Sequence, residues 1–170
     1  MMKKVTKQAI QYATLVGMLV AGLALMALKA LMPPAERHID AIIVHCTATP
    51  LGRKVTVDDI DRWHKARGWK GIGYHYVVDL DGTIYRGRAD DCVGAHCRGH
   101  NAHSIGVCYV GGLDAQGRPA DTRTPAQKEA MRWLVTALKK QYPHAKVYNH
   151  RRFANKACPC FDAEKEYGKL

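Results

Sequence analysis

The sequence predicts one α/β domain with a central mixed β-sheet of about five strands flanked by helices, preceded by an N-terminal hydrophobic helix. Strand-like and helix-like runs alternate from His38 onward, which is typical of this fold class. The chain has 170 residues, the size of one ordinary domain, and shows no internal repeat. We therefore expect a signal-anchor or signal segment with a Pro-rich linker over residues 1–37, and the folded domain over residues 38–170.

The N-terminal segment has the pattern of a membrane span. An uncharged run over residues 8–28 follows three lysines, Lys3, Lys4 and Lys7, and at about 1.5 Å per residue it is long enough to cross a hydrocarbon core. The preceding positive charges keep the start in the cytoplasm and direct the rest outward. A cleavable signal peptide and a buried soluble helix are the alternatives. We expect anchoring in the cell membrane through residues 8–32, with the domain in the periplasm or outside, or secreted after cleavage or release.

The first strand and helix of the domain follow from local signals. Residues 39–46 form a short apolar run rich in Ile and Val, which predicts a buried strand. Thr56 is followed three residues later by Asp59, as in a capping box, and apolar side chains then recur at helical spacing. These signals predict a helix over residues 57–67, with Gly68 as its C-cap.

The remaining strands are also bounded by turn signals. Residues 74–80 and 83–88 flank the pair Asp81-Gly82, which is the strongest short-range hairpin signal in the chain. Residues 104–110 form another strand-like run that ends at two glycines. Residues 145–149 predict the last strand, which leads directly into His150.

A second helix is predicted to begin at Thr124. Pro125 occupies its first position, and Gln127 completes a capping box with Thr124. The apolar side chains that follow form one stripe at helical spacing, which predicts the face buried against the sheet. These residues are Met131, Leu134, Val135, Leu138 and Tyr142.

The charge of the chain points to an anionic partner. A formal net charge of +11 suits nucleic acid, an acidic membrane surface or an anionic polymer such as a cell wall. The sequence contains no nucleic-acid reading motif and no aromatic-interleaved basic groove, so we expect no nucleic-acid partner. No Glu occurs between Arg37 and Lys128, which argues against glycosidase chemistry based on two carboxylates.

Two groups of residues compete as a zinc site, because imidazole and thiolate are preferred zinc ligands. The first resembles a structural zinc knuckle but also fits a solvated loop, and it comprises Cys92, His96, Cys97, His100 and His103. In the second, His45 ends a predicted strand, and His150 and Cys158 flank a loop. Two His and one Cys leave a fourth position open, as in catalytic zinc sites. Spacing alone supports this second group weakly, because a single His at a strand end is more often a structural residue than a ligand.

Six segments connect these observations: IIVHCTATP (42–50), WHKARGW (63–69), GYHYVVDLDGT (73–83), VGAHCRGHNAHSIGVCYVGG (93–112), TPAQ (124–127) and FANKACPCFD (153–162). In this order and at these separations they resemble the zinc-dependent N-acetylmuramoyl-L-alanine amidases of the T7 lysozyme and peptidoglycan-recognition-protein type. The resemblance extends over almost all of residues 39–162 and does not include the N-terminal segment.

The resemblance implies a catalytic zinc ion bound by His45, His150 and Cys158. It also implies that Tyr74 and Lys156 act as catalytic groups beside the metal. Zinc makes bound water a nucleophile and polarises the scissile carbonyl, and the two side chains can stabilise the charge that develops on it. Without a Glu in the central region, proton transfer is expected to depend on the activated water, Tyr74 and Lys156.

The implied reaction is hydrolysis of the bond between N-acetylmuramic acid and L-alanine of the peptidoglycan stem peptide, by a monomeric catalytic domain. His96 resembles a substrate-binding histidine of the cleft in this family, and a purely loop-stabilising role is the alternative. A non-catalytic peptidoglycan-binding protein of the same fold is the alternative, and the presence of Cys158 as third ligand favours the enzyme. Cys46 and Cys160 stand close to the implied ligands in the sequence, so they could pair with each other or replace Cys158.

Overall fold

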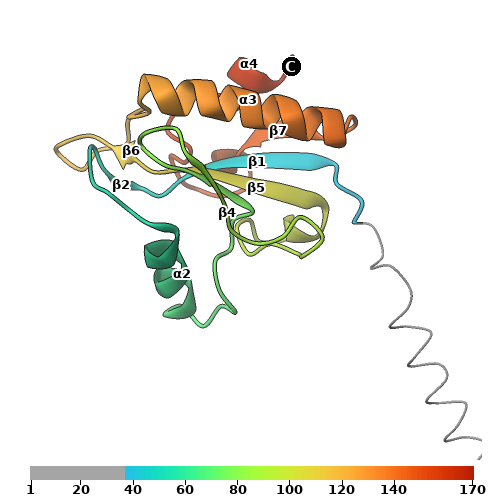
Figure 1. Ribbon diagram of the computed structural model, residues 1–170, viewed down its shortest axis with the longest axis horizontal. Coiled ribbons are helices and arrows are strands. Elements are labelled where there is room, and N and C mark those ends of the chain that lie inside the picture. Colours follow the sequence, from blue (N-terminus) through green and yellow to red (C-terminus); the bar gives the residue numbers. More distant parts are fainter. Residues whose placement is uncertain (1–36) are drawn as a thin grey trace, which may run out of the picture. The chain divides into compact units, whose positions relative to one another are not determined.

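Five strands form the central sheet of residues 37–170, the part of the chain that the computed structural model describes (Figure 1). Their order is β4-β3-β5-β1-β7, and only β4 runs antiparallel to its neighbour. The strands are β1 (Ala41–Cys46), β3 (Tyr76–Val78), β4 (Ile84–Arg86), β5 (Ser104–Tyr109) and β7 (Lys146–Asn149). The predicted mixed sheet of five strands is therefore confirmed, and its strands are shorter than the predicted runs.

The predicted N-terminal hydrophobic helix, with the expected anchor over residues 8–32, lies outside the described residues. Within residues 37–170, no helix combines the length and the apolar character that crossing a membrane requires.

Both predicted capping boxes are present. Helix α2 (Val57–Lys65) begins after Thr56, whose side chain accepts from the Asp59 backbone N–H while Asp59 accepts from that of Thr56. The helix ends two residues before the predicted limit, and Gly68 lies beyond it with a positive φ of 81°. Helix α3 (Pro125–Gln141) begins in the same way after Thr124. Local capping chemistry thus defines the start of both long helices.

Helix α3 covers one face of the sheet, and α4 (Ala163–Tyr167) lies on the same side (Figure 1). Four residues of the predicted stripe are buried there, and Tyr142 packs beside them partly buried. Side chains of β1 alternate between the two faces: Ile42 and Val44 join this core, whereas Ile43 packs on the opposite face. His45 therefore projects from the face that α3 leaves open.

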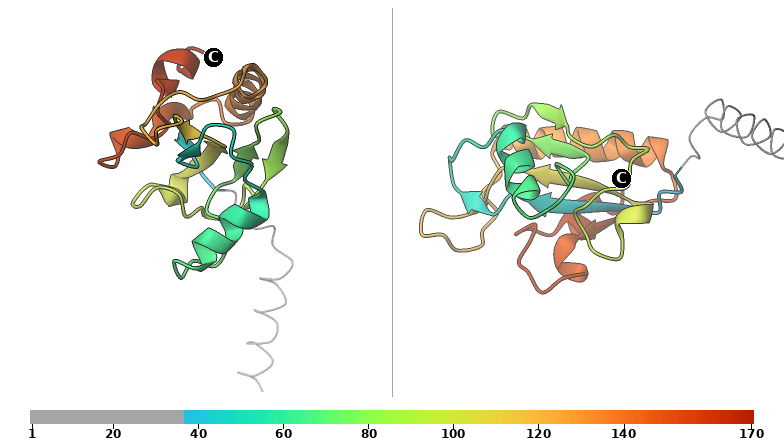
Figure 2. Two further views of the ribbon diagram at one scale, coloured as in Figure 1. Left: turned by 90° about the vertical axis from the view of Figure 1, so that its left-hand side faces the viewer. Right: turned by 90° about the horizontal axis from the view of Figure 1, so that it is seen from below.

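The opposite face is covered only in part. Helix α2 contributes Ile60 to a small cluster with Val77 of β3, and Figure 2 shows α2 and α3 on opposite sides of the sheet. Loops cover the rest of this face, including the segment over residues 93–101 and the segment after β7. These loops surround the carboxyl end of β1.

Several short elements were not predicted. Strands β2 (Thr49–Pro50) and β6 (Gly112–Leu113) form a separate parallel pair, and two 3-10 helices cover Asn101–His103 and His150–Arg152. Elements of two or three residues are too short for hydrophobic periodicity to reveal.

Candidate active site and metal centre

Two neighbouring strands position His45 and His150, the first two residues of the site. Strands β1 and β7 are parallel, and their pairing ends with Val44 opposite Asn149. The next residues are His45, near the end of β1, and His150, directly after β7. The carboxyl ends of parallel strands meet at one sheet edge, so the two imidazole rings lie 4.3 Å apart between centroids.

Cys158 completes the group. Its Sγ atom lies 3.9 Å from Nδ1 of His45, and the ligand atoms of His45, His150 and Cys158 all lie within 4.8 Å of one another. Zinc–nitrogen and zinc–sulfur bonds at a tetrahedral ion place N and S about 3.5 Å apart. Two imidazoles and a thiolate are also typical zinc donors, so the residues fit this ion.

The loop that carries Cys158 is held by hydrogen bonds to its backbone and to the Cys158 sulfur. The Arg151 N–H donates to the Cys158 carbonyl at 2.8 Å, and the Tyr109 hydroxyl donates to the Pro159 carbonyl at 2.7 Å. The Cys46 N–H donates to Sγ of Cys158 at 3.3 Å. These contacts hold the sulfur atom of Cys158 close to the imidazoles of the group.

The imidazoles of the group are held neutral. His45 is 1% exposed, and burial together with neighbouring His96 and His150 lowers its pKa well below the usual value. Burial and the positive charge of Lys156 lower the pKa of His150. Neutral imidazole is the form that coordinates a metal.

Cys46 and Cys160 lie beside this group without joining it. Their sulfur atoms are 3.8 Å apart. A hydrogen bond with Cys158 and burial raise the pKa of the Cys46 thiol, and burial and Cys46 raise that of Cys160 to about 12. The structure thus groups Cys158, rather than either of these thiols, with the two histidines.

The alternative cluster over residues 92–103 does not form a metal site. No second group of three His, Cys, Asp or Glu side chains converges on one point within the described part of the chain. Cys92 is exposed, whereas Cys97 is buried against Ala41 and Ile43. His96 turns instead toward His45, with its Nδ1 atom 3.1 Å from Nε2 of His45.

Tyr74 lies beside His45 of the metal group. It precedes β3 by two residues, and its ring centroid is 5.2 Å from that of His45. Burial raises the pKa of the Tyr74 phenol well above its usual value, so the hydroxyl keeps its proton and can donate a hydrogen bond. The ring centroid of Tyr74 also lies 5.3 Å from that of His64, whose Nδ1 atom accepts the Gly73 N–H.

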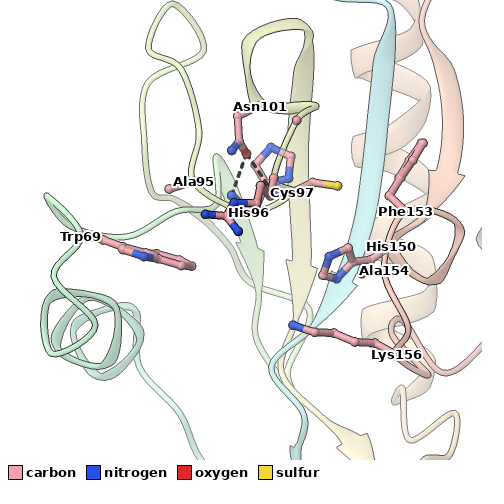
Figure 3. A pocket seen from close by; sticks show the side chains of 11 residues that line it. Trp69, Ala95, His96, Cys97, Asn101, His150, Phe153, Ala154 and Lys156 are labelled. Atoms are coloured by element: carbon pink, nitrogen blue, oxygen red, sulfur yellow. Dashed lines mark hydrogen bonds between the residues drawn. The ribbon is translucent and has the colours of Figure 1, made fainter.

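A cleft of about 400 Å³ opens next to the group (Figure 3). Trp69 lies on one wall, and His150, Phe153 and Lys156 lie on the other. His96 also lines the cleft, and the substrate contact expected of it stays a prediction. Among the described residues that line the cleft there is no Asp or Glu.

Trp69 and Phe153 were not singled out from the sequence. Trp69 is 37% exposed at the cleft, and Phe153 stacks on His100 at 4.0 Å between ring centroids. Both belong to segments of the resemblance, and that was the one signal that could have identified them. Their place on opposite walls depends on the fold.

Known proteins resemble the chain over most of its length. It is 47% identical over 134 residues to the endolysin of Klebsiella phage KP32, covering 79% of this chain and 89% of that protein. It is 44% identical over 130 residues to the endolysin of Escherichia phage T7, covering 76% and 86%. The solved structure of the N-acetylmuramoyl-L-alanine amidase LysC from Clostridium intestinale URNW superposes with a TM-score of 0.66 at 31% identity, covering 81% and 88%.

The predicted location at the cell membrane is wrong in the light of these relatives, which are phage endolysins. No helix of residues 37–170 could cross a bilayer. The expectation came from the length of an uncharged run, and a run of apolar and small residues meets that criterion without being specific for a span.

The family model described as N-acetylmuramoyl-L-alanine amidase (Amidase_2) matches residues 35–161. This range contains His45, Tyr74, His150, Lys156 and Cys158, together with the sheet that positions them. The chain belongs to the N-acetylmuramoyl-L-alanine amidase family.

Proposed function

We propose that residues 38–170 form a zinc-dependent catalytic domain that hydrolyses peptidoglycan between N-acetylmuramic acid and L-alanine of the stem peptide. The observation that carries the proposal is the convergence of His45, His150 and Cys158 at the edge of an open cleft. These three side chains are assigned to the metal, and Tyr74 and Lys156 are assigned to catalysis.

When bound, zinc supplies an activated water and polarises the carbonyl that is attacked. The Tyr74 hydroxyl remains protonated, so it can donate a hydrogen bond to the carbonyl oxygen as negative charge develops there. The Lys156 ammonium group lies on the cleft wall beside His150 and offsets the same charge. Donors placed in this way typically contribute about 100-fold to 1,000-fold to the rate of an enzyme.

The cleft suits an anionic glycopeptide. Its cationic side chains, Arg98 and Lys156, can pair with carboxylates of the stem peptide, and the rings of Trp69 and Phe153 offer apolar surface to a sugar or side chain. The net charge of +11 favours association with an anionic wall polymer. We expect the catalytic domain to act as a monomer.

A peptidoglycan-binding protein without catalysis is the alternative function. Such a binding protein would need the cleft but not a complete set of metal ligands. The presence of Cys158 with both histidines, and of Tyr74 and Lys156 beside them, favours the enzyme.

The test uses the full-length protein loaded with one equivalent of zinc and purified peptidoglycan. The suspension should clear while new L-alanine amino termini appear in proportion. Release of reducing sugar ends without amino termini would contradict the assigned bond. Binding to the wall without either product would favour the non-catalytic alternative, and Cys158→Ala provides the control that should bind without cleaving.

A further inference from the structure

The two nitrogens of His45 have different partners. Nδ1 faces the metal group, 3.9 Å from the sulfur of Cys158, and Nε2 lies 3.1 Å from Nδ1 of His96. A nitrogen that binds a metal carries no proton, so the other nitrogen of a neutral imidazole must carry it. His45 can therefore offer Nδ1 to a metal only if its Nε2–H is directed at His96.

The surroundings of His96 make it the matching acceptor. The Ser104 hydroxyl donates to the His100 carbonyl at 2.7 Å. Since a hydroxyl has a single hydrogen, Ser104 can only accept from Nε2 of His96, which lies 3.3 Å away. With its hydrogen on Nε2, a neutral His96 presents a lone pair on Nδ1, directly toward His45.

The ring of His96 is fixed in this position by its neighbours. A Cβ atom at Gly106 would lie 2.6 Å from the ring, and one at Gly94 would lie 2.5 Å from it, so both glycines leave room for the imidazole. The backbone N–H groups of His96 and Cys97 each donate to Oδ1 of Asn101 at 2.9 Å, as Figure 3 shows.

Burial separates this chain of hydrogen bonds from solvent. His45 is 1% exposed, His96 is 7% exposed and Ser104 is fully buried. Water therefore has little access to His45 and does not readily replace a lost hydrogen-bond partner. Loss of the partner His96 should for this reason have a measurable effect.

We propose that His96 is a positioning residue of the metal centre. It accepts the Nε2–H of His45 and so fixes the tautomer and the orientation in which Nδ1 of His45 faces the zinc ion, while Ser104 fixes His96 in turn. This inference depends on the zinc site of the proposed function. It gives His96 a role beyond the substrate contact that its place in the cleft predicts. Outer partners of this kind typically change metal affinity by about 10-fold to 100-fold when removed.

The test compares zinc dissociation constants of the full-length protein, measured by competition with a chromophoric chelator. His96→Leu removes the acceptor and should weaken zinc binding by about 10-fold to 100-fold. His96→Asn offers an amide oxygen near the position of Nδ1 and should retain most of the affinity. His144→Leu removes an exposed histidine and serves as the matched control without effect.

Two results would overturn the proposal. Equal zinc affinity of His96→Leu and the wild type would show that the acceptor is dispensable, and equal loss in the Leu and Asn variants would assign the effect to ring packing. A wild type that binds no zinc would contradict the metal site itself, which is a separate outcome.

A measurement on the unmodified protein avoids dependence on how the variants fold. Long-range ¹H–¹⁵N correlation spectra of the zinc-loaded chain should show His45 protonated at Nε2 and coordinated at Nδ1. The opposite assignment would contradict the proposal even if every variant failed to fold.

Discussion

The Sγ atom of Cys158 lies 3.9 Å from Nδ1 of His45, although 113 positions separate the two residues in the chain. Strand β1 sets the position of His45, and hydrogen bonds from Arg151 and Tyr109 set that of the loop carrying Cys158. The metal group is thus assembled by the sheet edge and one loop. Its integrity can be tested separately from that of the fold.

Replacing Cys158 with Ala should abolish hydrolysis and remove most of the bound zinc, because two imidazoles alone hold the ion weakly. Cys160→Ser, two residues away, should keep both zinc and activity, since the structure does not place Cys160 in the group. Zinc content by elemental analysis and release of L-alanine termini provide the measurements. A chelator should inactivate the wild type, and added Zn²⁺ should restore it. Loss of zinc from Cys160→Ser alone would mean that the wrong thiol has been assigned.

Tyr74→Phe should lower kcat by about 100-fold to 1,000-fold, because it removes one hydrogen-bond donor to the developing charge. Zinc affinity should stay unchanged, since the Tyr74 ring contacts His45 but is not part of the donor group. Tyr85→Phe, on β4 and 44% exposed, is the matched control. A Tyr74→Phe enzyme with wild-type kcat would remove Tyr74 from the catalytic groups.

Lys156→Met should also lower kcat, by about 100-fold, because the cleft loses the cation next to His150. The substitution also removes a charge that contributes to the low pKa of His150. Protons should then compete with zinc at a higher pH, so zinc should dissociate at a higher pH than from the wild type. Zinc titrations at several pH values check this shift, and Lys140→Met, an exposed lysine on α3, is the control. Unchanged kcat would contradict the catalytic assignment.

Local chemistry was sufficient to predict much of the fold. The capping boxes at Thr56 and Thr124 and the glycine turn at Gly82 involve residues close in sequence, and all three are present. The short β2–β6 pair joins Thr49 to Gly112 and carries no local pattern. Its formation depends on where β1 and β5 end, which only the assembled sheet determines.

The candidate site was harder to predict from the sequence than the fold. Residue types alone left two possible zinc groups, and the ordered motifs were needed to favour His45, His150 and Cys158. The contact of His96 with His45 could not be predicted, because it depends on the space left by Gly106 on a neighbouring strand. Contacts across strands and loops are set by packing, and sequence spacing does not encode them directly.

Protonation of His64 should make the stability of the metal-free protein depend on pH. His64 is 5% exposed and burial lowers its pKa to about 4 from 6.5. Between these values the unfolded chain binds more protons, so the free energy of unfolding falls as the pH drops, by up to about 1.4 kcal/mol per pH unit for one group. Above pH 6.5 the contribution is constant. His64→Asn keeps an acceptor for the Gly73 N–H but cannot titrate, so urea unfolding of the chelator-treated variant should show a shallower dependence on pH in this window. The other histidines contribute equally to both proteins, and identical slopes would therefore contradict the assigned pKa of His64.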